Sequence, residues 1–169
     1  MERLGVTKII SGGQNGADIA GLKFAKWIGL KTGGWIPNGF RTIDGNKPEY
    51  AELYNLKETI PRYYPPRTAM NVKSSDATIW FASNWSSGGE ILTKNMCIRY
   101  NKPYFDVCVN TFQDLGIPVT PPWELAAWLT EHNVKVLNIA GNSEQTSPGI
   151  EAVVFQWLKD AFNEQEMGN

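Results

Sequence analysis

The chain has 169 residues, of which 42% are hydrophobic and 20% are charged. This length and composition are typical of one soluble globular domain with a buried core, so we interpret residues 1–169 as a single domain. The formal net charge of −1 argues against a dedicated nucleic-acid surface, because such surfaces carry a basic excess.

Several classes of protein are disfavoured by what the sequence lacks. Residues 1–5 have no apolar stretch of the signal-peptide type, and no segment approaches the ~20 apolar residues of a membrane span. Cys97 and Cys108 have neither metal-binding nor redox spacing, and with one histidine, His132, there is no zinc-type cluster. We expect a cytoplasmic protein with reduced thiols, no membrane contact, and no metal, zinc or haem site.

The first third of the chain predicts a strand, a helix and a second strand. A β-type run spans 7–10, apolar residues then recur at helical spacing over 16–29, and a short strand follows at 32–36. The stretch 37–66 is rich in Pro, Gly, Asn and Tyr and has no long period. We predict that it is an ordered excursion over the surface, and connections of this length are often functional.

The rest of the chain alternates helices with strands. We predict helices at 67–74, 89–100, 121–132 and 149–162, and strands at 77–82, 103–109 and 134–140. The run 77–82 is apolar throughout, which is typical of a central parallel strand. The alternation predicts one α/β, Rossmann-like domain with a mainly parallel sheet of about five strands flanked by helices.

Three of the predicted strands end in small-residue turns that contain glycine and precede a helical pattern. Helix N-termini and glycine-rich backbone favour anions, and ligands of parallel sheets bind at the carboxyl ends of the strands. We therefore predict a shared site for a phosphate-bearing ligand, although each turn could also be a tight connection that needs positive φ. The candidate binding residues in the turns are Gly12, Gly13, Gln14, Asn15, Gly16, Ser86, Ser87, Gly88, Gly89, Gly141, Asn142, Ser143 and Ser147.

Four further polar residues are candidates for this site. Arg67 is the main candidate cation, because guanidinium binds phosphate oxygens in bidentate fashion; alternatively it is a surface residue paired with Asp76. Asn71 shares a helix face with Arg67. Asp18 lies in a first helical turn, where it either accepts hydrogen bonds from a neutral part of the ligand or complements the helix dipole. Asn71 and Asp76 would orient the ligand or support Arg67.

The sequence does not identify catalytic residues. The first turn matches neither the P-loop nor the dinucleotide-binding spacing, and there is no Ser–His–Asp or Cys–His arrangement. Glu90 follows the second turn and is a candidate catalytic carboxylate, but the helix dipole explains its position equally well.

Several motifs together resemble those of the molybdenum-cofactor carrier family, which belongs to the SLOG-type Rossmann-like superfamily. The motifs are Ile9-Ile10-Ser11-Gly12-Gly13-Gln14 with Gly16 and Asp18, Thr32-Gly33-Gly34-Trp35 with Pro37 and Gly39, Asp44-Gly45, Arg67-Thr68 with Asn71, Ser75-Asp76 with Thr78, Ser87-Gly88-Gly89, Asn138-Ile139-Ala140-Gly141, and Ser147-Pro148-Gly149-Ile150. The resemblance covers nearly the whole chain. It implies a parallel α/β fold, frequent oligomerisation, and a crevice for a molybdopterin-like or nucleotide-like ligand, and it adds Trp35 to the candidate site.

The chain departs from the family pattern at positions that often carry basic or polar residues. Asn15 replaces a usual threonine, Ile19 follows Asp18 where a polar or basic residue is common, Asn38 replaces a frequent lysine, and Asn142-Ser143 replaces Pro-Arg. Each missing cation removes a charge-assisted contact of about 1.5–3 kcal/mol. The ligand is then either less charged than molybdopterin or held mainly by backbone, with Arg41 and Arg67 as the remaining cations.

Three functional hypotheses follow. The first is a carrier or binding protein for a small anionic ligand, either molybdenum cofactor or a nucleotide, that assembles as a homodimer or homotetramer. The second is a nucleotide-processing hydrolase of the phosphoribohydrolase type, although the family's Pro-Gly-Gly-x-Gly-Thr-x-x-Glu motif is absent. The third is an interaction module that uses Trp85 and Trp123, but the net charge disfavours nucleic acid as its partner.

Overall fold

A computed structural model describes residues 3–61, 65–111 and 119–163. The fold is α/β, as predicted, with a central sheet of six strands in the order β5-β2-β1-β8-β6-β7, all of whose pairings are parallel. The strands are β1 (Lys8–Ile10), β2 (Lys31–Ile36), β5 (Leu56–Glu58), β6 (Ala77–Ala82), β7 (Tyr104–Cys108) and β8 (Val136–Gly141).

The last strand of the chain lies in the middle of the sheet. β8 pairs on one side with β1, where Ile10 is opposite Asn138, and on the other with β6, where Trp80 is opposite Ala140. Because side chains alternate along a strand, Trp80, Asn138 and Ala140 share one face of the sheet. The carboxyl ends of the first, sixth and eighth strands therefore meet at one edge.

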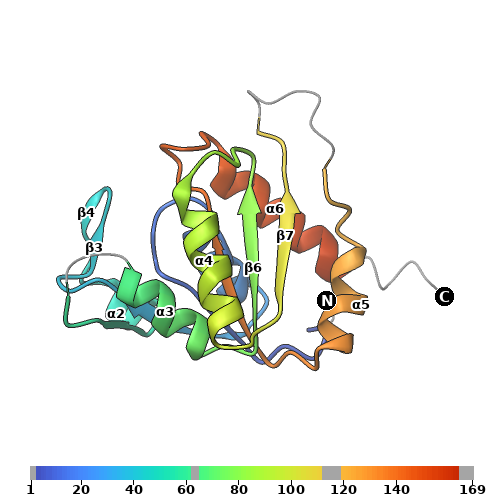
Figure 1. Cartoon of the computed structure of the whole chain (residues 1–169), viewed down its shortest axis with the longest axis horizontal. Coiled ribbons are helices and arrows are strands. Elements are labelled where there is room, and N and C mark those ends of the chain that lie inside the picture. The colour runs from blue at the N-terminus through green and yellow to red at the C-terminus, as the bar shows by residue number, and fades with distance from the viewer. Residues whose placement is uncertain (1–2, 62–64, 112–118, 164–169) are drawn as a thin grey trace.

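Helices cover both faces of this sheet. Figure 1 shows α3 and α4 in front of the sheet and α6 behind it, and α1 packs against α6. The helices are α1 (Ala17–Trp27), α2 (Tyr50–Leu53), α3 (Pro65–Lys73), α4 (Gly88–Arg99), α5 (Glu124–Glu131) and α6 (Ile150–Asn163). Pro65 and Pro66 occupy the first turn of α3, where the missing N–H groups cost no intrahelical hydrogen bond.

Two clusters of buried apolar side chains hold the layers together. The larger one joins α1, α5 and α6 to the strands, with Phe24, Phe81, Leu137 and Phe162 among its fully buried side chains. The smaller one contains side chains from α1, β2 and β5, among them Ile19, Ile36 and Leu56. At about 25 cal/mol per Å² of apolar area, such burial is the main favourable term in folding.

The five predicted strands are present, but the stretch 37–66 contains more structure than its sequence predicts. It contributes the sixth strand, β5, the hairpin β3 (Arg41–Thr42) and β4 (Gly45–Asn46), and the single turn of α2. β5 has only three residues, of which Lys57 and Glu58 are exposed, so it leaves no periodic apolar signal.

The tryptophans of the carboxyl-terminal third of the chain have different environments. Trp157 is part of the buried core, and Trp128 stacks on Phe105 with 5.2 Å between the ring centroids. Trp123 is 64% exposed, which leaves it available for an interaction. Among the described residues, no helix combines the length and apolarity needed to cross a membrane.

Candidate functional site

A cavity of about 250 Å³ lies at the carboxyl-terminal edge of the sheet, between the sheet and helices α3 and α4. Its floor is the sheet face that carries Trp80, Asn138 and Ala140. Thr68 and Asn71 of α3 and Leu92 and Thr93 of α4 form its walls. This is the location at which parallel α/β sheets bind ligands.

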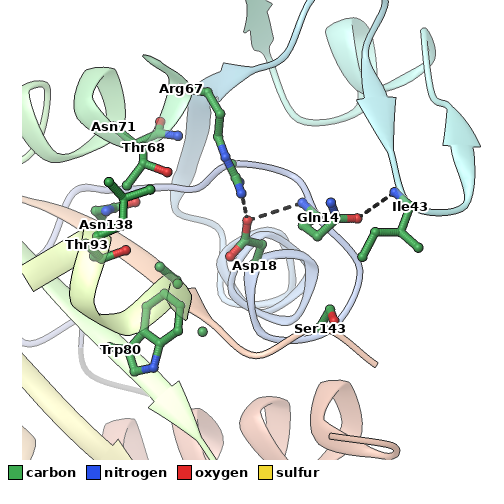
Figure 2. A pocket seen from close by; sticks show the side chains of 15 residues that line it. Gln14, Asp18, Ile43, Arg67, Thr68, Asn71, Trp80, Thr93, Asn138 and Ser143 are labelled. Atoms are coloured by element: carbon green, nitrogen blue, oxygen red, sulfur yellow. Dashed lines mark hydrogen bonds and ion pairs between the residues drawn. The ribbon is translucent and has the colours of Figure 1, made fainter. Parts of the chain in front are cut away.

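The charged residues of the cavity lining form an ion pair. Arg67 Nη1 lies 2.8 Å from Asp18 Oδ2, and their side chains are 16% and 5% exposed. Arg67 also lies directly over Gly12, where a Cβ atom would be 1.5 Å from Nη1. Gly12 therefore leaves space for the guanidinium, and Asp18 neutralises its charge (Figure 2).

The carboxyl group of Asp18 lies in competing environments. Burial raises its pKa, while Arg67 and the backbone N–H groups of Gln14 and Gly12 act in the opposite direction, and burial has the larger effect. Arg67 is thus paired with Asp18, not with Asp76. Since these two are the charged residues of the cavity lining, the described lining has no uncompensated charge.

A chain of hydrogen bonds runs from this ion pair to the rim of the cavity. The Gln14 N–H donates to Asp18 Oδ2 at 3.2 Å, and the Ile43 N–H donates to Gln14 Oε1 at 2.9 Å. Asn15 Nδ2 donates to Asp44 Oδ2 at 2.8 Å. These bonds hold the β3–β4 hairpin over the first turn, so that Ile43 lines the cavity (Figure 2).

The first glycine turn uses much of its hydrogen-bonding capacity within itself. The Gly13 N–H donates to Ser11 Oγ, the Gln14 N–H to Asp18, and the Asn15 N–H to Gln14 Oε1. Asp18, in the first turn of α1, thus places its carboxylate against the turn that precedes the helix, where the helix dipole favours a negative charge.

The third turn is closed in the same way by a carboxylate of the chain. Glu144 accepts hydrogen bonds from the N–H groups of Gly149 and Glu151, at 2.7 and 2.8 Å, at the start of α6. Asn142 is 2% exposed, and its Oδ1 accepts from the N–H groups of Ser83 and Asn84 and from Ser147 Oγ. Asn142 and Ser147 therefore join two loops and do not line the cavity.

The second turn differs from the other two. Ser87 is the N-cap of α4, and no side chain of the described residues caps this helix. Gly88 and Gly89 are exposed, and a Cβ atom at Gly88 would meet nothing within 4 Å. Gly89 lines the cavity and packs against Trp80, whose Cη2 would lie 3.0 Å from an added Cβ.

Two predicted site residues lie away from the cavity. Asp76 precedes β6 at the opposite end of the sheet, and its Oδ2 accepts hydrogen bonds from the N–H groups of Lys135 and Val136. Trp35 lies on β2, and its backbone N–H and C=O pair with the side chain of Asn71, which does line the cavity. The position of Asp76 is explained by strand pairing.

Glu90, the candidate catalytic carboxylate, is not part of the cavity lining. It pairs with Lys94 one helical turn away at 2.9 Å, and Lys94 also contacts Asp106 at 2.7 Å. Ile19, at a position where the family often has a polar or basic residue, points into the smaller apolar cluster, so this side chain does not reach the cavity. The described residues contain no group of three or more potential metal-binding side chains.

The structure brings eight of the eighteen predicted residues into one cavity lining. They are Gly12, Gln14, Asp18, Arg67, Asn71, Gly89, Gly141 and Ser143. The others form the turns behind the lining or lie elsewhere: Gly13, Asn15, Gly16, Trp35, Asp76, Ser86, Ser87, Gly88, Asn142 and Ser147. Sequence reasoning missed Ile43, Thr68, Trp80, Leu92, Thr93, Asn138 and Ala140. A polar residue within an otherwise apolar central strand was the available signal for Asn138.

Fold and site together define a Rossmann-like protein of the SLOG type. The chain matches the model of the circularly permutated YpsA SLOG family over residues 9–162 and belongs to that family. It is similar to the crystal structure of a protein from Syntrophus aciditrophicus named "Putative molybdenum carrier protein", with 34% identity and a TM-score of 0.81. That match covers 94% of this chain and 96% of the other. No curated protein matches the chain.

Proposed function

We propose that this protein binds a small ligand with a phosphate-type group, and that the group contacts the N-terminus of α4 at the mouth of the cavity. The observation that carries the proposal is the difference between the three helix N-termini. The turn before α1 donates its Gln14 N–H to the carboxylate of Asp18, although Gly16 gives α1 no side-chain cap. Glu144 accepts the N–H groups at the start of α6, whereas the N-terminus of α4 at Ser87 has no side-chain cap and no carboxylate bonded to its turn among the described residues. An uncapped helix start offers N–H groups and a favourable dipole to an anion.

The charge of the lining supports a ligand of modest charge. Arg67 contributes a cation, but Asp18 compensates it at 2.8 Å. The name of the similar Syntrophus protein makes molybdenum cofactor our first candidate ligand. A nucleotide is the second candidate, since it also joins a phosphate to a flat polar ring.

The decisive experiment places a carboxylate where the phosphate would bind. Ser87→Asp should cap α4 and leave the protein at least as stable, while it repels an anion from the same N–H groups. Ser87→Asn is the matched control, because it caps the helix without charge. We expect Ser87→Asp to weaken binding of inorganic phosphate and GMP at least tenfold by calorimetry, with Ser87→Asn near wild type. Equal affinities in the two variants would contradict the proposal.

Native mass spectrometry of freshly purified protein tests the identity of the ligand. A retained adduct with the mass of a pterin or a nucleotide, reduced in Ser87→Asp, is the expected result. The same spectra give the assembly mass, and we propose a homodimer or homotetramer, because Ile91 and Ile98 on α4 and Trp123 are more than 60% exposed. A purely monomeric mass would contradict the proposed assembly.

A nucleotide hydrolase is the second candidate function. Asp18 is the carboxylate that lines the cavity, whereas Glu90, the candidate catalytic carboxylate, is not in the lining. If the protein is a hydrolase, release of free base from GMP should therefore depend on Asp18 and be lost in Asp18→Asn. The carrier proposal predicts no release above that of a heat-denatured control.

A further inference from the structure

Three asparagines are buried next to the cavity, and their side-chain amides differ in how they are satisfied. Asn71 pairs both of its polar atoms with the backbone of Trp35, at 2.8 and 2.9 Å. Asn142 Oδ1 accepts three hydrogen bonds. Asn138 Nδ2 donates to Thr78 Oγ1 at 3.1 Å, but its Oδ1 is buried without a hydrogen-bond partner among the described residues.

Asn138 is built into the floor of the cavity. It lies on β8, where the side chain is 2% exposed, and it lines the cavity beside Thr93 and Asn71 (Figure 2). Its neighbours along the strand, Leu137 and Ile139, are fully buried apolar residues. β8 pairs with its two neighbours through the backbone, so the pairing itself needs no polar side chain here, and a buried amide oxygen without a partner is destabilising. The fold alone therefore does not explain this asparagine.

We propose that Asn138 Oδ1 accepts a hydrogen bond from a ring N–H of the bound ligand, so that the floor of the cavity selects a lactam-type heterocycle. This inference rests on the proposed function and adds the chemistry of the ligand's ring. With Asn138 Nδ2 donating to Thr78 Oγ1, the amide oxygen is the atom left without a partner among the described residues, and an amide oxygen accepts only from N–H or O–H donors.

The indole N–H of Trp80 is a buried hydrogen-bond donor, whereas Asn138 Oδ1 is an acceptor. Trp80 lines the same floor, is 7% exposed, and its Nε1 has no hydrogen-bond partner among the described residues. A ring that carries both an N–H and a carbonyl offers a partner to each group. The ring should be neutral, because Arg67 and Asp18 already neutralise each other in the same lining.

The first test needs no ligand. Asn138→Leu removes the unpaired oxygen, so we expect ligand-free protein to unfold at a temperature equal to or about 2–4 °C above that of wild type. Asn71→Leu, the matched control, breaks two satisfied hydrogen bonds and should lower the unfolding temperature. Asn138→Leu combined with Thr78→Val removes the remaining polar partner as well and should behave like the single variant. A loss in Asn138→Leu as large as that in Asn71→Leu would overturn the inference.

The second test measures selectivity for the ring. The probes are GMP and 1-methyl-GMP, and pterin and 3-methylpterin, which differ within each pair by one ring N–H. Calorimetry should show that wild-type protein binds the N–H form at least tenfold more tightly and that Asn138→Leu removes this preference. Equal binding of both forms by wild type overturns the inference. If wild type binds phosphate but none of the four probes, the assignment of the ring is overturned while the proposed function stands.

Discussion

The turns at 11–16 and 86–89 have similar sequences but opposite roles in the structure. The first is buried, holds Arg67 over Gly12, and donates its Gln14 N–H to the carboxylate of Asp18. The second is exposed, and the helix that it begins has no side-chain cap. A glycine-rich turn before a helix therefore does not by itself define an anion site. Both helices carry an acidic residue in the first turn, Asp18 and Glu90, and neither has a side-chain cap. What separates the two is that Asp18 accepts a hydrogen bond from the N–H of the preceding turn, whereas Glu90 pairs with Lys94.

The largest expected effect tests whether the ion pair of the first turn is structural. Arg67→Met leaves Asp18 buried without its cation and should cost about 3–5 kcal/mol of the free energy of unfolding. Lys94→Met on α4 is the matched control. It removes two more exposed ion pairs, with Glu90 and Asp106, so it should cost about 1 kcal/mol or less. Urea denaturation measures both, and equal losses would remove the contrast between the two turns.

A glycine from each turn provides the next comparison. Gly16 has φ +89°, and an added Cβ would lie 2.4 Å from the backbone oxygen of Asn142. Gly16→Ala should therefore cost more than about 2 kcal/mol. Gly88→Ala meets open space at the start of α4 and should stabilise the protein by about 0.4–1 kcal/mol. Thermal unfolding of the two variants decides, and a destabilising Gly88→Ala would show that the second turn is packed as well.

The smallest expected effect is a dependence on pH. Burial raises the pKa of Asp18 in the folded state, so its contribution to stability is fully present below the unfolded value near 3.8 and is lost as pH rises through the folded value. The stability of wild type relative to Asp18→Asn should therefore fall with rising pH. Urea titrations from pH 3 upward measure this difference. A difference that grows with pH would mean that Arg67 outweighs burial.

The sequence predicted the architecture well, because strands such as β6 are apolar throughout and alternate with clear helical periods. It missed β5, whose three residues include the exposed Lys57 and Glu58, and the two-residue strands of the hairpin. Such short elements are stabilised by their neighbours in space rather than by a local pattern. The position of β8 between β1 and β6 likewise depends on pairing across more than fifty residues.

The candidate site was predictable at the level of its location. Gly12, Asp18 and Arg67 were expected in one site, and all three line the cavity. The ion pair between Asp18 and Arg67, however, depends on a contact between α1 and α3. Asp76 was assigned to the same site as a residue that would orient the ligand or support Arg67. Its carboxylate instead accepts hydrogen bonds from the backbone N–H groups of Lys135 and Val136. Side chains that pair with distant backbone atoms leave no signature in a single sequence.

Glu144 is a single side chain whose replacement could change which anionic groups the protein binds. Its carboxylate accepts hydrogen bonds from the N–H groups of Gly149 and Glu151, while its own N–H donates to Asn15 Oδ1. The carboxylate of Glu144 thus occupies the N-terminus of α6, where the carboxylate or phosphate of a ligand would otherwise be favoured. Relatives that exchange this glutamate for a small neutral residue would keep the same backbone and yet accommodate a second anionic group. The number of charges that a ligand carries could then diverge within one fold by the replacement of a single side chain.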